Sequence, residues 1–195
     1  MSPAPKATLH RYLRTTRETL LWKLEGLSEY DVRRPLTSTG TNLLGVVKHL
    51  AEIEGGYFGV TFGRPCSDIP TLDRSVPNVD MYATADESRD EVIGWFLAAA
   101  EHADETIATL ELDAPGRVPW WGDAGEVTLH HVLVHVVTEE QRHLGQVDVL
   151  RERIDGAVGH RRDNSNLDAG VDWPGHVDHL EVIARSFLRD DDQGA

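Results

Sequence analysis

Imidazole and carboxylate side chains recur at intervals of four in residues 127–153, at His131, His135, Glu139 and His143. In an α-helix, residues four apart lie on successive turns and drift only about 40° around the axis. The four side chains would therefore form a stripe along the margin of the helix's apolar face. Polar groups buried there must be hydrogen-bonded, ion-paired or bound to a metal, because their burial without partners is costly. This requirement makes the stripe the strongest functional signal in the sequence.

A further histidine lies at the margin of an apolar face in another segment. Residues 42–58 predict a helix whose apolar side includes Val46 and Ile53, and His49 projects beside them. A lone histidine in this position more often has a structural role than a metal-binding one. Metal sites in helix bundles, however, are assembled from side chains on facing helices. Two helices with marginal histidines therefore favour a site between them.

The spacing of apolar residues predicts the elements that would hold these side chains. Amphipathic periodicity predicts long helices over residues 7–27, 42–58, 87–110 and 127–153, and no segment is a convincing strand. We therefore expect an all-α four-helix bundle. The long connection over residues 61–86 allows the second and third helices to run parallel, which predicts an up-down-down-up order. Glycine and polar residues then separate a domain of residues 1–156 from a C-terminal extension, 157–195, with a short helix over residues 176–189.

Composition narrows the classes of function. The chain has 195 residues, enough for one core, and a formal net charge of −14, which opposes nucleic-acid binding. A single cysteine, Cys66, excludes an internal disulfide framework and favours a cytoplasmic location. We find neither a signal peptide nor a run of apolar residues long enough to span a membrane. We therefore expect a small-molecule substrate, and a homodimer through the last helix is an open alternative.

Four residues outside the predicted helical stripes have open or structural interpretations. An incidental loop cysteine is a better interpretation of Cys66 than a nucleophile, because no histidine is adjacent to it in the sequence. The adjacent Trp120 and Trp121 could equally wall a ligand pocket or close the end of the bundle. His102 lies among acidic neighbours and is expected to face solvent.

Two segments carry a family resemblance. TSTGTNLLGVVKHLAEIEGGYFG and, about ninety residues later, TLHHVLVHVVTEEQRHLGQVDVLRERIDG resemble the DinB-like superfamily of metal-binding four-helix bundles, particularly its YfiT-like branch. The resemblance covers roughly residues 7–156. It implies a divalent-metal site with His49 from the second helix and His143 from the fourth. Many members have a histidine four residues before the latter, whereas this chain has Glu139, as in proteins of the mycothiol-dependent maleylpyruvate isomerase type.

The resemblance thus implies His49, Glu139 and His143 as metal ligands. Helical periodicity alone leaves Glu139 and Glu140 unresolved, with a slight preference for Glu140, and the motif alignment favours Glu139. Two imidazoles and one carboxylate suit zinc with an open fourth position, while iron or nickel are alternatives. His135 would line the pocket or support a ligand, and Gln146 could orient a substrate. His131 is expected to lie outside the site.

The implied chemistry is metal activation of a small nucleophile. Related enzymes use low-molecular-weight thiols such as mycothiol, so we expect a thiol-dependent S-transferase or isomerase. A hydrolase would use the same ligands with bound water, and the sequence does not separate the two. A ferritin-like di-iron site is suggested by Glu140 and His143 at ExxH spacing, but that architecture needs two such motifs. A non-catalytic metal-binding or dimerisation module is the remaining alternative, since no separate general base is evident.

Overall fold

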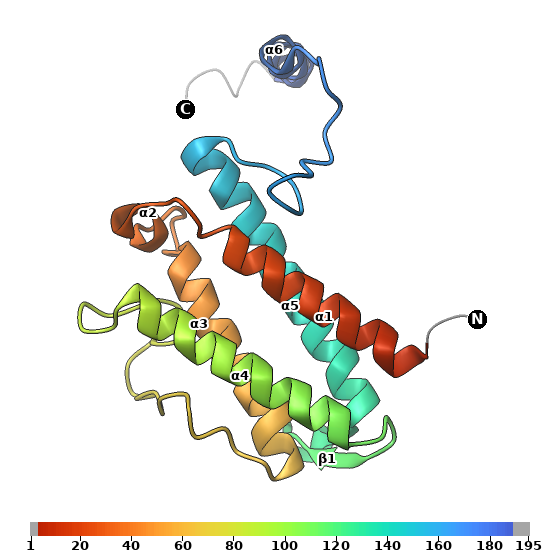
Figure 1. Cartoon of the computed structure of the whole chain (residues 1–195). Helices are drawn as coiled ribbons and strands as arrows, with labels where there is room; N and C mark the ends of the chain where they lie inside the picture. Colours follow the sequence, from red (N-terminus) through yellow and green to blue (C-terminus); the bar gives the residue numbers. More distant parts are fainter. Residues whose placement is uncertain (1–3, 189–195) are drawn as a thin grey trace.

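The computed structural model describes residues 4–188, and these are mostly helical, which confirms the all-α prediction. Long helices lie side by side (Figure 1), and α3 packs against both α4 and α5, while α1 packs mainly against α5. Their bounds are Pro5–Trp22 for α1, Leu43–Glu54 for α3, Arg89–Thr109 for α4 and Leu129–Asp155 for α5. Shorter helices are α2, Glu29–Arg33, and α6, Trp173–Arg185.

Local sequence explains where the site-bearing helices begin and end. The Asn42 side chain accepts a hydrogen bond from the Gly45 amide at the start of α3, and Thr128 accepts one from His131 at the start of α5. Gly156, with φ of 77°, ends α5 in the left-handed conformation. These caps fix the register in which α3 and α5 present their histidines.

Several predicted helix bounds and the expected absence of strands were wrong. The helix expected to reach residue 58 is α-helical only to Glu54 and continues as a π-helical turn, Gly55–Gly59, then a 3-10 turn, Val60–Phe62. The helix α1 stops at Trp22 rather than residue 27, and Gly26 follows in a turn with φ of 74°. A short antiparallel hairpin of β1, Pro115–Arg117, and β2, Glu126–Thr128, precedes α5. Three-residue strands are too short for an alternating pattern to reveal them.

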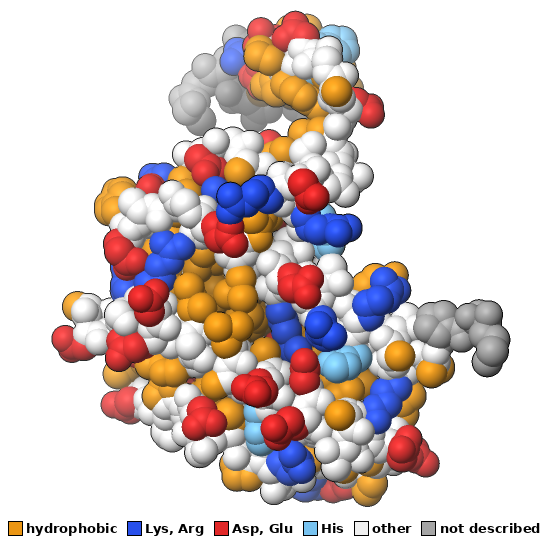
Figure 2. Space-filling model, in the orientation of Figure 1, with side chains coloured by type: hydrophobic (Ala, Val, Ile, Leu, Met, Phe, Trp, Pro, Cys, Tyr) orange, Lys and Arg blue, Asp and Glu red, His pale blue; other side chains and the backbone are white. Residues whose placement is uncertain are grey.

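The core divides into two hydrophobic clusters along the long helices. One includes Leu50, Phe96 and Val147, and the other includes Phe58 and Leu133, all almost completely buried. Between α1 and α4 the surface is hollowed into a groove of about 600 Å³ with hydrophobic side chains on its floor (Figure 2). The surface between α1 and α4 is therefore more open than the buried clusters along α3 and α5.

Two further segments complete the described chain. Residues 63–88, here named the crossover segment, connect the end of the 3-10 turn to α4. The helix α6 starts three residues earlier than predicted and ends at Arg185, so the predicted helix extends too far, and its last residue, Arg189, lies outside the described residues. None of the α6 residues is buried, and its hydrophobic side chains are exposed (Figure 2). Among helices within residues 4–188, none combines the length and apolar character that a membrane crossing requires.

Candidate metal centre

The structure brings together the three side chains that the resemblance implied as ligands. His49 comes from the middle of α3, and Glu139 and His143 come from successive turns of α5. One potential donor atom from each residue lies within 4.8 Å of the others. Glu139 Oε1 is 3.1 Å from His143 Nε2 and 3.9 Å from His49 Nε2. Both imidazoles thus direct the same ring nitrogen towards one carboxylate.

The opposite ring nitrogens have their own partners. His49 Nδ1 donates to Asp80 Oδ2 at 2.7 Å, and His143 Nδ1 donates to Gln146 Oε1 at 3.0 Å. An acceptor at Nδ1 leaves Nε2 as the nitrogen with a free lone pair in a neutral imidazole. Such partners commonly orient metal-ligating histidines. Gln146 therefore touches a candidate ligand, and its predicted contact with substrate stays a prediction.

Burial also prepares these groups for a cation. Desolvation, assisted by the neighbouring His49, lowers the pKa of His143 although Glu139 opposes the shift. Burial alone would raise the pKa of Asp80, but the hydrogen bond from His49 brings it below its usual value. The lowered pKa of His143 favours the neutral imidazole, which is the form that binds zinc and similar divalent ions. The donor set and its convergence fit a divalent metal.

Glu140 lies on the other side of α5, in the core. It is fully buried beside Glu54, and Arg17 donates two hydrogen bonds to Glu54, at 2.6 and 2.5 Å. Arg17 also donates to Asp104 at 2.5 Å. Burial and the negative charge of Glu54 raise the pKa of Glu140 well above its ordinary value. Helical periodicity slightly favoured Glu140 as a metal ligand because it lies nearer the apolar face. In the structure this position is part of a buried charge network that joins α1, α3, α4 and α5.

His135 lies one turn before Glu139 in an aromatic cluster. Its ring centroid is 4.7 Å from that of Tyr57 and 4.8 Å from that of Trp121. The Tyr57 hydroxyl accepts hydrogen bonds from the indole nitrogens of Trp120 and Trp121, at 3.3 and 3.2 Å. Desolvation lowers the pKa of His135. His131, one turn earlier, is exposed and contacts Trp121.

A cavity of about 600 Å³ opens beside His49, between α3 and the crossover segment. Its walls are largely apolar and include Trp120 and, from the crossover segment, Cys66, while Glu52, Arg74 and Asp80 supply charge. Trp120 therefore walls a pocket, and Trp121 packs against the core, so each tryptophan follows one of the two interpretations. The π-helical turn contributes Gly56, where a Cβ atom would lie 3.1 Å from the Trp120 ring. The lack of a side chain at Gly56 therefore leaves room for the Trp120 ring that forms this wall.

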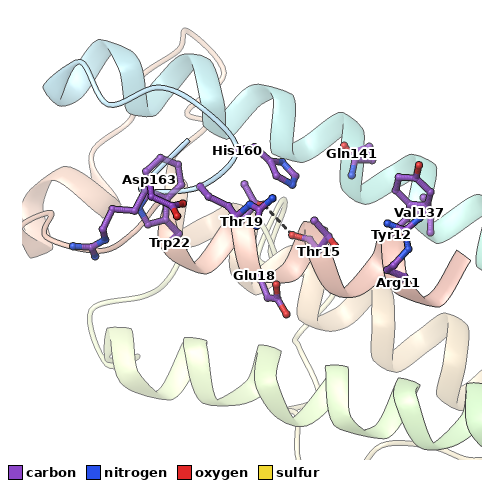
Figure 3. A pocket seen from close by; sticks show the side chains of 12 residues that line it. Arg11, Tyr12, Thr15, Glu18, Thr19, Trp22, Val137, Gln141, His160 and Asp163 are labelled. Atoms are coloured by element: carbon purple, nitrogen blue, oxygen red, sulfur yellow. Dashed lines mark hydrogen bonds between the residues drawn. The ribbon is translucent and has the colours of Figure 1, made fainter. Parts of the chain in front are cut away.

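A second hollow, of about 790 Å³, lies between α1, α5 and residues 160–163 (Figure 3). It is lined by Tyr12, Trp22 and Gln141 among others, and by none of the three converging residues. The smaller cavity, which His49 lines, is therefore the better candidate for binding a substrate near the centre.

Sequence reasoning missed Asp80 and misplaced His102. Asp80 lies 31 residues after His49, in a segment without periodicity. No regular spacing therefore connects the two residues in the sequence. His102 was expected to face solvent, but it is half-buried and its Nε2 donates to the Arg64 carbonyl at 2.6 Å. The acidic neighbours of His102 gave no indication of this contact, because it joins α4 to the crossover segment.

The helical fold and the converging imidazole and carboxylate groups define a protein of the DinB-like class. The chain belongs to the mycothiol S-transferase family, whose family model matches residues 8–156. This match confirms the DinB-like relationship inferred from the two motif segments. A search of curated proteins found no match to the chain.

Proposed function

We propose that the protein is a metal-dependent transferase that uses mycothiol, or a similar low-molecular-weight thiol, as co-substrate. The observation that carries this proposal is the convergence of His49, Glu139 and His143 beside a cavity large enough for a small molecule. The family match supports transfer chemistry with a thiol. The finer elements of the proposal are the metal ligands, the use of zinc in preference to nickel or iron, and the thiol itself.

Each residue of the candidate centre has a separate role in this proposal. Nε2 of His49, Nε2 of His143 and a Glu139 oxygen would hold the ion, and Asp80 and Gln146 would keep the rings in orientation. When bound, the ion would supply Lewis acidity that favours a thiol in its thiolate form. The apolar walls of the cavity would bind the electrophilic substrate and exclude water from it. His135 would line the site from the aromatic cluster.

The arrangement of the whole chain extends the proposal. We take the long helices to be a four-helix bundle in up-down-down-up order, as the lengths of their connections indicate, within a domain of residues 1–156. A cytoplasmic location and a homodimer through α6 also belong to the proposal. The exposed hydrophobic side chains of α6 support the dimer, because a 13-residue helix is marginally stable in water without packing.

Metal analysis and thiol dependence test the function. Purified protein should contain about one divalent ion per chain, and His49→Ala and His143→Ala should lose it. With the metal present, turnover of small electrophiles should require a thiol when several are compared. A wild-type protein that takes up no divalent ion would refute the centre. Turnover that proceeds equally without any thiol would instead identify a hydrolase.

A further inference from the structure

The crossover segment reaches the centre through one residue. Asp80 accepts the Nδ1 hydrogen of His49 at 2.7 Å, and both side chains are more than four-fifths buried. Arg74, from the same segment, pairs with Asp80 at 3.7 Å and with Glu52 on α3. The link from the crossover segment to His49 therefore lies within a small charged cluster at the mouth of the cavity.

The backbone that carries Asp80 is fixed against α3. At Gly45 a Cβ atom would lie 1.9 Å from the carbonyl oxygen of Met81, so only glycine permits this approach. The Asn42 side-chain amide donates to the same carbonyl at 3.3 Å. The Lys48 ammonium group donates to the Tyr82 carbonyl at 3.1 Å and to the Glu87 carboxylate at 2.8 Å.

These anchors come from α3 and its N-cap Asn42, within seven positions of His49. The helix that supplies the histidine thus also holds the segment that supplies the histidine's partner. This double attachment gives the Asp80 carboxylate a fixed distance and direction relative to the imidazole. A surface loop without such anchors would lose more conformational entropy in making the same contact.

We propose that Asp80 is a positioning residue that acts on the metal through His49. A carboxylate accepts hydrogen bonds and donates none, so it fixes the proton of the neutral imidazole on Nδ1 and leaves Nε2 free to bind the ion. It also increases the basicity of the imidazole, which strengthens the bond to a metal. This inference rests on the proposed function, because it takes His49 as a ligand.

The test compares Asp80→Asn with Asp86→Asn, a change of the same kind at an exposed position in the same segment. Zinc affinity is measured by competition with a chromogenic chelator. Asp80→Asn should weaken zinc binding by roughly 10- to 100-fold, the usual effect of losing such a partner. Asp86→Asn should stay within about twofold of wild type, and Asp80→Glu, which keeps the carboxylate, should recover part of the loss.

A second measurement needs no metal. In metal-free protein labelled with ¹⁵N-histidine, His49 should be the Nδ1-protonated tautomer in wild type and in Asp86→Asn, and should lose that preference in Asp80→Asn. An unchanged tautomer, or a zinc affinity equal to that of Asp86→Asn, would overturn the inference while leaving the metal centre intact. A wild-type protein that does not bind zinc would instead refute the proposed function, and the tautomer measurement would still report on Asp80.

Discussion

Replacement of Arg17 by Met should remove the cation on which the buried network of Glu54 and Glu140 depends. Arg17 is 6% exposed and Glu54 is 0% exposed, and the guanidinium group donates twice to that carboxylate. Removing one partner of a buried ion pair leaves a charge without compensation and costs about 3–5 kcal/mol. A domain is stable by only about 5–15 kcal/mol, so the variant should lose a large share of its free energy of unfolding.

Urea denaturation followed by circular dichroism measures this loss. With a slope of about 2 kcal/mol per molar urea, a loss of about 4 kcal/mol lowers the midpoint by about 2 M. Arg14→Met, on the exposed side of the same helix, should change stability by about 0.5 kcal/mol or less. The double variant Arg17→Met/Glu54→Gln should recover part of the loss, because it removes the charge left unpaired.

Two results would refute this reasoning. A loss below about 1 kcal/mol in Arg17→Met would mean that the contact behaves like a surface pair. A double variant as unstable as the single one would mean that the unpaired Glu54 charge is not the cause of the loss.

Three further predictions concern the centre, pH and assembly. Glu139→Gln should weaken metal binding much more than Glu140→Gln, as measured by chelator competition. The reverse order would mean that Glu140, and not Glu139, is the carboxylate ligand. Burial lowers the pKa of His135 from 6.5, so the unfolded chain binds its proton first as pH falls. The contribution of neutral His135 to the free energy of unfolding is therefore present above pH 6.5 and is lost as pH falls through the lowered pKa. His135→Phe should reduce this loss of stability in acid, measured by urea titrations of metal-free protein at several pH values. Leu180→Asp on α6 should shift a dimer to monomer in light scattering, and a wild-type monomer at high concentration would contradict the dimer.

The sequence predicted the long helices well because their apolar periodicity extends over several turns. Where a local geometry depends on contacts from elsewhere, prediction was less accurate. The apolar pattern of α3 continues through the π-helical turn to Tyr57, so periodicity alone predicted an unbroken α-helix. The Asp80 contact depends on how the crossover segment packs against α3, and no spacing in the sequence encodes that packing.

Glu139 and Glu140 show most clearly what helical geometry determines and what it leaves open. Adjacent helical residues point about 100° apart, so one glutamate must face a different neighbour from the other. Periodicity identified Glu140 as nearer the buried face, and it is indeed fully buried, but in contact with the Arg17 and Glu54 network. The better-buried Glu140 lies in the core, where burial and the charge of Glu54 raise its pKa, whereas the marginal Glu139 lies beside both histidines. A carboxylate binds a cation in its ionised form, and burial next to a second carboxylate opposes ionisation, so the surroundings of Glu140 favour a role in the core over the role of ligand.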